Sequence, residues 1–381
     1  MVGGEGAALE AIFRAAVAAC DPRAVVRAAL AEPALASRLQ PRPTTIIAIG
    51  KAAAAMAAGA IDALGPRRGL VVVPDGVAVD EAALRGLDVR RGGHPIPDAR
   101  SEAAGREALR IAGAVGREAA LLVLVSGGAS ALGAVPRDGL TLVEKVARTT
   151  AAARAGAPIA ELNRLRTELS AIKGGRLAGA CDGMVVTLVA SDVPGDDVAV
   201  VGSGPTVPPG GPTGDDVVRL VAGLGRLRAE AAAAARARGL APVVRAADLV
   251  GDIAEVEAVV EREAERGLWI AGGEWTVRLG GEPVGVGGRA TELALRLARA
   301  WAGRTDRVAL VAGSDGVDGT GPAAGAVVDG TTWHAIAAAG VDPARALAGH
   351  DSGAALAAVG ATVETGPTGV NHADLVLVAA R

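Results

Sequence analysis

Lysine and asparagine are scarce in this chain of 381 residues, and their side chains can bind anions and metal-bound phosphates. There are three lysines, Lys51, Lys145 and Lys173, against 36 arginines, and two asparagines, Asn163 and Asn371. Because the composition is biased so strongly toward Ala, Gly, Val and Arg, a retained Lys or Asn indicates a position that needs that side chain. All except Lys145 lie in glycine-, hydroxyl- or acid-rich runs. A compact ammonium group binds phosphate as a point charge, and Arg does not replace it directly. The pattern indicates anion chemistry, and phosphoryl transfer above all.

Lys51 follows Gly50 at the end of the apolar run 45–50 and precedes an alanine-rich segment typical of a helix. Backbone N–H groups at a helix start favour an anion, and Lys51 would add a full positive charge. The spacing is not that of a Walker A loop. The alternative interpretation is a solvated lysine at a helix start.

A second candidate for anion binding is the run Ser126-Gly127-Gly128-Ala129-Ser130, directly after the apolar run 121–125. Its glycines allow successive backbone N–H groups to converge on one anion. An ordinary tight turn is the competing interpretation. A nucleophile elbow is excluded, because the pattern G-x-S-x-G is absent here.

Two aspartates are the best metal candidates, since Asp192 and Asp315 each follow an apolar run and a serine. Mg²⁺ is commonly held by one or two carboxylates together with phosphates and water. Either residue could instead cap the following helix. Arg289 opens a predicted helix after Gly287-Gly288 and suits a phosphate or a carboxylate. The four histidines have no metal-ligand spacing.

Short apolar runs that alternate with helical segments must position these residues. The predicted strands cover 45–50, 70–74, 121–128, 184–192, 268–274, 308–316 and 375–380, and the predicted helices include 101–115, 141–155 and 289–302. Strand–turn–helix alternation predicts α/β architecture with mostly parallel sheets flanked by helices. In such sheets, ligands bind beyond the carboxyl ends of the strands. The expected domains are 1–245 and 246–381, with the active site in the cleft between them.

Composition excludes several other classes of function. A net charge of −3 and only five aromatic residues give neither a basic footprint nor a stacking platform for nucleic acid. Two cysteines make no disulfide framework. The first helix carries Glu5, Glu10 and Arg14 rather than the basic start of a signal peptide, and no run predicts a membrane span. We therefore expect a cytoplasmic protein without a membrane or nucleic-acid partner.

Taken together, the motifs resemble the glycerate 2-kinase family, the glycerate kinases with a C-terminal MOFRL domain. The resemblance covers most of the chain through the runs 49–53, 92–98, 126–132, 162–178, 191–208, 272–277, 285–295, 312–330, 351–353 and 365–371. It implies two α/β domains, the first Rossmann-like. It also implies ATP- and Mg²⁺-dependent phosphorylation of the 2-hydroxyl of D-glycerate to 2-phosphoglycerate, with a homodimer as a possible assembly.

By the same resemblance, Lys51, Arg289 and Asp192 are the expected catalytic residues. Asp192, Asp315 and Asp318 are expected to bind the metal ion. The residues expected to face the nucleotide and substrate are Ser126, Gly127, Gly128, Ser130, Asn163, Arg166, Lys173, Gly204, Glu274 and Asn371.

The chain departs from the family pattern at Ala290, His350, Gly353, Pro322 and Ala373. These changes remove hydrogen-bonding groups near the expected cleft but retain the Lys, Arg and Asp positions. Two alternatives therefore stay open, a diverged kinase for another hydroxy acid and a catalytically silent nucleotide-binding homologue.

Overall fold

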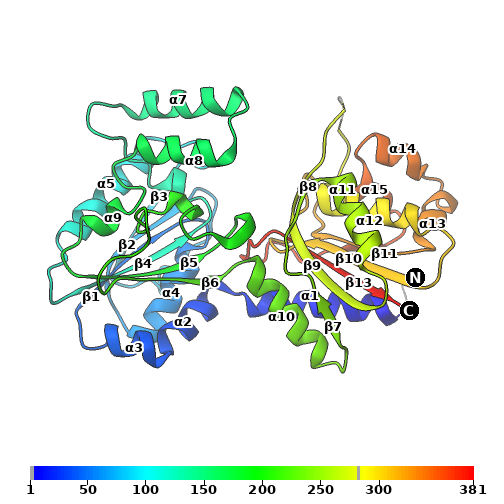
Figure 1. Cartoon of the computed structure of the whole chain (residues 1–381), viewed down its shortest axis with the longest axis horizontal. Coiled ribbons are helices and arrows are strands. Elements are labelled where there is room, and N and C mark those ends of the chain that lie inside the picture. Colours follow the sequence, from blue (N-terminus) through cyan, green and yellow to red (C-terminus); the bar gives the residue numbers. More distant parts are fainter. Residues whose placement is uncertain (1–3, 281–283) are drawn as a thin grey trace. The chain divides into compact units, whose positions relative to one another are not determined.

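The computed structural model describes residues 4–280 and 284–381. The chain divides into two compact units. The parallel-sheet unit comprises Pro22–Ala222, and the mixed-sheet unit comprises Met1–Asp21 with Gly223–Arg381 (Figure 1). None of the helices in the described residues has the length and apolar character that crossing a bilayer requires.

The parallel-sheet unit is built on six parallel strands in the order β3-β2-β1-β4-β5-β6. This is the Rossmann order, as expected for the first domain. Its strands are β1 (Thr44–Ile49), β2 (Arg68–Pro74), β3 (Leu87–Gly92), β4 (Ala120–Ser126), β5 (Met184–Ala190) and β6 (Val217–Ala222). Strands β4 and β5 are buried along their whole length, which explains their continuous apolar sequences.

Helices cover this sheet and extend from it. They are α2 (Pro22–Ala31), α3 (Pro33–Leu39), α4 (Ala53–Leu64), α5 (Ala99–Gly113), α6 (Ala129–Leu132), α7 (Leu142–Arg154), α8 (Ile159–Glu168) and α9 (Arg176–Gly179), with the 3₁₀ turns η1 (Pro194–Asp196) and η2 (Val201–Ser203). Helix α7 lies within the predicted helix 141–155 and starts with a capping box of Thr141 and Glu144. Figure 1 shows α7 and α8 side by side.

The mixed-sheet unit differs from the expectation of a mostly parallel second sheet. Its main strand order is β12-β11-β10-β13-β9-β7, and β8 pairs with β9. Pairing is antiparallel except where β7 and β8 meet β9. The strands are β7 (Pro242–Val244), β8 (Leu249–Asp252), β9 (Gly267–Thr276), β10 (Arg307–Gly313), β11 (Gly325–Asp329), β12 (Thr362–Val363) and β13 (Asp374–Ala380). Residues 314–324, between β10 and β11, contain no helix, so the chain returns beside β10 in the opposite direction.

The division of the chain also differs from the boundary expected at 245/246. The segment 217–222, which was not among the predicted strands, is the last strand of the parallel sheet. Helix α1 (Gly4–Ala19) packs Leu9, Ile12 and Phe13 into the core of the mixed-sheet unit, together with α10 (Leu224–Arg236). These apolar residues recur at helical spacing, so the first helix needs a partner surface and finds it on the C-terminal sheet. The other helices of this unit are α11 (Ile253–Glu263), α12 (Arg289–Ala300), α13 (Thr332–Ala338), α14 (Pro343–Ala348) and α15 (Ser352–Ala357).

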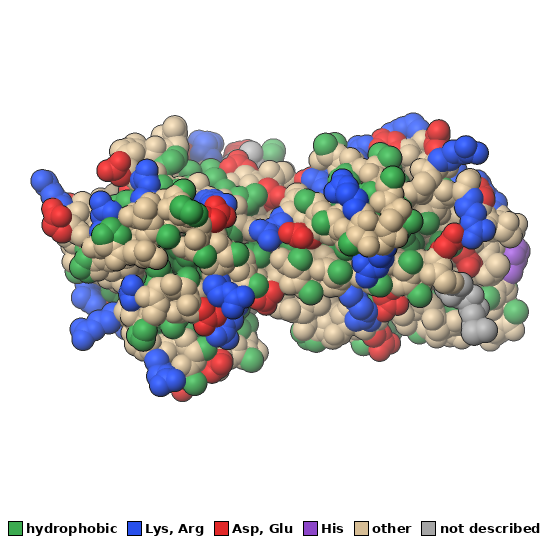
Figure 2. Space-filling view, turned by 90° about the horizontal axis from the view of Figure 1, so that it is seen from below, with side chains coloured by type: hydrophobic (Ala, Val, Ile, Leu, Met, Phe, Trp, Pro, Cys, Tyr) green, Lys and Arg blue, Asp and Glu red, His purple; other side chains and the backbone are tan. Residues whose placement is uncertain are grey.

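Charged side chains are dispersed over both units. Figure 2 shows Lys and Arg interspersed with Asp and Glu on the face in view. This agrees with the small net charge of −3. The face in view has no extended surface of one sign.

Candidate functional site

Three loops meet at the carboxyl edge of the parallel sheet, after the neighbouring strands β1, β4 and β5. The backbone N–H of Lys51 donates to the Gly127 carbonyl at 2.8 Å, and that of Ala52 donates to Ser126 Oγ at 3.1 Å. A Cβ at Gly50 would collide with Ser126, and one at Gly127 would collide with the Asp192 carboxylate. The two glycines therefore permit the close approach that brings Lys51, Ser126 and Asp192 to one place.

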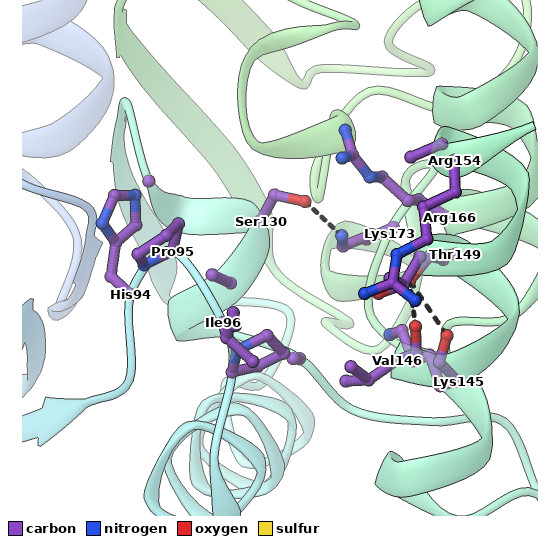
Figure 3. Close-up of a pocket in the computed structure, with 16 residues that line it drawn as sticks. His94, Pro95, Ile96, Ser130, Lys145, Val146, Thr149, Arg154, Arg166 and Lys173 are labelled. Carbon is purple, nitrogen blue, oxygen red and sulfur yellow. Dashed lines mark hydrogen bonds between the residues drawn. The ribbon is translucent and has the colours of Figure 1, made fainter. Parts of the chain in front are cut away.

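A cavity of about 520 Å³ adjoins this edge, and we call it the cationic cavity (Figure 3). Its charged lining residues are His94, Lys145, Arg154, Arg166 and Lys173. His94, Pro95 and Ile96 form one wall, and α7, α8 and the Lys173 loop form the opposite wall. No Asp or Glu is among the described residues that line it. The lining selects for an anionic ligand.

Lys173 is the most buried of these cations, with 3 % of its surface exposed. Its ammonium nitrogen Nζ makes a short hydrogen bond to Ser130 Oγ, which lies 3.3 Å from Ser203 Oγ. Burial lowers the pKa of Lys173 well below its ordinary value, and the charges of Lys145 and Arg166 add to this effect.

Lys145 lies in the same cavity and is 4 % exposed. Its Nζ donates to the Val135 carbonyl at 3.1 Å. Burial lowers the pKa of Lys145 to about 8, although the Glu102 carboxylate acts in the opposite direction. Burial and the charge of Lys51 likewise lower the pKa of His94.

Asn163 and Gly204 do not line the cavity but hydrogen-bond to residues in or beside its wall. Asn163 Oδ1 accepts a hydrogen bond of 3.1 Å from Arg166 Nη1. The Gly204 carbonyl accepts one of 2.8 Å from the Gly175 backbone, two residues after Lys173. The structure thus brings the predicted residues of the parallel-sheet unit around one edge and one cavity.

A second cavity, of about 460 Å³, lies in the mixed-sheet unit around the start of α12. Arg289 lines it and is paired with two carboxylates. Its Nε donates to Asp374 Oδ2 at 2.6 Å, and its Nη1 donates to Glu274 Oε1 at 2.6 Å. Burial raises the pKa of Asp374 to about 6, against the opposing effect of Arg289, and Asp318 and Asp315 add to the rise. The positive charge of Arg289 is therefore largely compensated within the protein.

Asp318 holds the N-terminus of α12. Its Oδ1 accepts from the Ala290 backbone at 3.0 Å, and its Oδ2 accepts from the backbone and the hydroxyl of Thr291 at 2.8 and 2.7 Å. Both oxygens thus accept hydrogen bonds from the first turn of α12, as a capping carboxylate does. Asp315 and Asn371 line the same cavity. Asp315 Oδ1 accepts from the Val317 backbone at 3.1 Å.

Of the positions that depart from the family pattern, His350 and Ala373 line this cavity, and Gly353 lines the small cavity beside it. His350 Nδ1 lies 2.8 Å from Glu292 Oε2, and the Gly353 backbone donates to the Val286 carbonyl at 2.9 Å. Ala290 is fully buried, and Ala373 lines the cavity. Pro322 lines a neighbouring small cavity of about 70 Å³.

No group of three or more His, Cys, Asp and Glu that could hold a metal ion occurs among the described residues. Magnesium needs no such group, because one or two carboxylates suffice when phosphates and water complete the shell. Asp192, beside the Gly127 turn, fits this requirement in the parallel-sheet unit. Asp315, half-buried at the end of β10, fits it in the mixed-sheet unit.

Three residues of the candidate cavities, Lys145, His94 and Asp374, were not predicted from the sequence. The scarcity of lysine was the only signal for Lys145. Lys145 was not predicted as a site residue, because its neighbours in the sequence do not form a glycine-, hydroxyl- or acid-rich run. His94 follows β3, and its neighbours form a cavity wall. Asp374 begins β13 and ion-pairs with Arg289. That pairing joins residues far apart in the sequence, and nothing local predicts it.

Comparison with known proteins agrees with this architecture. Residues 8–238 match the family described as "Domain of unknown function (DUF4147)", and residues 267–374 match the "MOFRL family". The D-glycerate 2-kinase of Thermotoga maritima is 32 % identical, over 87 % of this chain and 89 % of that protein. A protein of Agrobacterium vitis that carries a provisional hydroxypyruvate reductase name is 36 % identical, over 96 % of this chain and 92 % of its own length.

A crystal structure of glycerate kinase from Thermotoga maritima is similar to this chain with a TM-score of 0.89 and 30 % identity, covering 99 % of both chains. With the Rossmann-ordered first sheet and both family matches in place, the chain belongs to the glycerate kinase family that joins a DUF4147 domain to a MOFRL domain.

Proposed function

We propose that this protein is a glycerate 2-kinase, which uses ATP and Mg²⁺ to phosphorylate the 2-hydroxyl of D-glycerate to 2-phosphoglycerate. The observation that carries the proposal is the convergence of Lys51, the Ser126–Gly128 turn and Asp192 at one sheet edge beside the cationic cavity. Phosphoryl transfer depends mainly on positioning and charge neutralisation, and this edge supplies both. The kinase names of similar proteins support the same activity.

In this proposal, Lys51 stabilises negative charge on the transferred phosphoryl group or binds the substrate carboxylate. Asp192 is the first candidate for binding Mg²⁺, and Asp315 is the second. The ion would neutralise phosphate charge during transfer. Asp318 caps α12, the helix that begins with Arg289. Asp318 therefore acts on the reaction indirectly, by holding this helix.

Arg289 remains a candidate for contacting a phosphate or a carboxylate. Its pairing with Asp374 and Glu274 fixes the guanidinium group in place before ligand arrives. An anion would have to compete with these two carboxylates. We therefore expect Arg289 to contribute more through orientation than through net charge.

The decisive assay combines the purified protein with ATP, MgCl₂ and D-glycerate and identifies the phosphorylated product by ³¹P NMR. The expected product is 2-phosphoglycerate, and chelation of Mg²⁺ should abolish its formation. A panel of other hydroxy acids should be assayed in parallel. If one of them is phosphorylated and D-glycerate is not, that acid is the substrate. ATP binding without transfer to any acceptor would instead identify a silent homologue.

A reductase is the rival candidate, favoured by the name of the Agrobacterium vitis relative and by the Rossmann strand order. Against it, the turn after β1 reads Gly50-Lys51-Ala52-Ala53 and lacks the glycine pattern that admits a dinucleotide pyrophosphate. Oxidation of NADH or NADPH in the presence of hydroxypyruvate would establish the rival. We expect none above background.

A further inference from the structure

His350 lines the cavity of the mixed-sheet unit and is held there by a buried carboxylate. Its Nδ1 lies 2.8 Å from Glu292 Oε2, and Glu292 is only 3 % exposed. A carboxylate accepts hydrogen bonds and does not donate them, so Nδ1 is the ring nitrogen that carries the proton. The other nitrogen, Nε2, bonds to none of the described residues, and the side chain keeps 16 % of its surface exposed. His350 therefore has one nitrogen held by the protein and one available to a ligand.

The backbone at His350 supports a role beyond packing. Its φ of 52° lies in the left-handed region, which is uncommon for a residue with a side chain. Contacts on both sides maintain this geometry. The Gly349 carbonyl accepts from the Gly285 backbone at 3.0 Å, and Asp351 Oδ1 accepts from the Val286 backbone at 2.7 Å. Uncommon backbone conformations that the surrounding structure maintains cluster at functional sites, which makes His350 a candidate for contact with a ligand.

The surroundings of His350 restrict the ligand group that can bind to Nε2. Among the described residues, the cavity lining has four carboxylates against one guanidinium group, namely those of Glu292, Asp315, Asp318, Asp374 and Arg289. An anionic group would be repelled by this lining unless a cation accompanied it. A hydroxyl group carries no charge and can donate its proton to the lone pair of Nε2. An alcohol is therefore the ligand group that fits this position best.

We propose that Nε2 of His350 accepts a hydrogen bond from a substrate hydroxyl group that the reaction does not consume, so that His350 selects for a hydroxylated ligand. The inference rests on the kinase activity proposed above. Both substrates of that reaction carry such groups, namely the 3-hydroxyl of D-glycerate and the ribose hydroxyls of ATP. The reacting 2-hydroxyl is a poorer match, because it must lie against the transferred phosphoryl group. That anion would be repelled by the carboxylates near His350.

Isothermal titration calorimetry with matched ligands tests the proposal. Each comparison removes one hydroxyl group: ATP against 2′-deoxyATP and 3′-deoxyATP, and D-glycerate against D-lactate. The two acids are titrated in the presence of Mg²⁺ and a non-hydrolysable ATP analogue. In the wild-type protein, loss of the hydroxyl group that contacts His350 should weaken binding by about tenfold. The comparison that shows this loss identifies the acid or the nucleotide as the source of the hydroxyl group.

His350→Asn is the informative variant. Asn tolerates the left-handed backbone, and its amide group can replace Nδ1 in the contact with Glu292, but it has no group at the position of Nε2. We expect this variant to bind the hydroxylated ligand about tenfold more weakly and to bind the deoxy ligand as the wild-type protein does. His334→Asn is the matched control, because His334 is exposed on α13 and does not line the cavity. It should match the wild-type protein with every ligand.

Several outcomes would overturn the proposal. An equal loss of affinity for every ligand in His350→Asn would show that His350 only maintains the fold. Discrimination between hydroxylated and deoxy ligands that persists in this variant would place the contact elsewhere. Wild-type protein that binds none of the ligands, or binds each matched set equally well, would also refute it. Phosphorylation of glycerate without discrimination at His350 removes only this inference, and discrimination by a protein that phosphorylates no acceptor removes only the proposed function.

Discussion

Replacing Lys145 with Met should stabilise the parallel-sheet unit, because a buried ammonium group without a counter-ion destabilises the folded state. Burial lowers the pKa of Lys145 from 10.5 to about 8. At about 1.4 kcal/mol per pKa unit, that difference corresponds to about 3 kcal/mol. The lost hydrogen bond offsets little, since the Val135 carbonyl also accepts from Ser170 Oγ at 3.1 Å and from the Ala171 backbone at 3.0 Å. We therefore expect a gain of about 2–3 kcal/mol at pH 7.

The gain should depend on pH in a defined direction. Below pH 8, Lys145 is protonated in both the folded and the unfolded chain, so the cost of burying its charge is fully present. Between pH 8 and 10.5 the folded state releases its proton first, and the cost declines. At pH 9.5 the advantage of the variant should fall to about 1.4 kcal/mol. Above pH 10.5 it should disappear.

Differential scanning calorimetry measures this effect and resolves separate transitions if the two units unfold independently. The transition of the parallel-sheet unit should rise by about 5–10 °C at pH 7. Arg148→Met is the matched control, since it removes an exposed cation from the same helix and should change stability by no more than about 0.5 kcal/mol. A destabilised Lys145→Met variant, or a gain independent of pH, would refute the reasoning. Lys145 lines the cationic cavity, so the same variant should bind an anionic ligand there more weakly, which is the usual conflict between stability and function at a site.

The remaining predictions concern the sheet edge and α12. Lys51 is exposed at the sheet edge. Lys51→Arg keeps the charge but changes its geometry, so kcat should fall by about 100-fold with unchanged stability, and near-normal kcat would show that Lys51 takes no part in the reaction. Asp318→Ala removes three hydrogen bonds from the start of α12 and should cost about 2–3 kcal/mol in urea unfolding. Asp315→Ala should instead lower activity at nearly unchanged stability. If Asp315→Ala lowered stability and Asp318→Ala lowered only activity, Asp315 would be the structural residue and Asp318 the metal ligand. Gly127→Ala places a methyl group against the Asp192 carboxylate and should lower kcat/KM more than tenfold. A nearly unchanged kcat/KM would show that this carboxylate takes no part in the reaction.

Regular elements were predictable wherever the sequence pattern is local. All seven predicted strands occur, because each is an uninterrupted apolar run. The strand Val217–Ala222 was missed, since it directly precedes α10 and carries Arg219 in its middle. The antiparallel strand β11 was missed because Gly325 opens it and no helix precedes it. The place of α1 on the C-terminal sheet follows from packing alone, which no local pattern specifies.

The part of the candidate site that lies at strand ends could be predicted from the sequence. Gly50-Lys51, the Ser126 turn and Asp192 each follow a strand, and adjacency of β1, β4 and β5 in a parallel sheet brings them together. The cationic cavity was not predictable, because its lining comes from the β3–α5 loop, α6, α7, α8 and the Lys173 loop. The capping role of Asp318 likewise depends on a helix that starts 29 residues earlier, at Arg289.

The two cavities differ in how their cations are compensated, and this difference separates their roles. In the mixed-sheet unit, Arg289 already contacts the carboxylates of Glu274 and Asp374, so an incoming anion gains little net attraction there. In the cationic cavity, no Asp or Glu is among the described lining residues, so an incoming anion does not compete with a carboxylate there. Binding energy for an anionic group is therefore expected from the parallel-sheet unit. The paired arginine is better suited to orienting a group whose charge is neutralised elsewhere, because its two carboxylates hold the guanidinium plane in one direction.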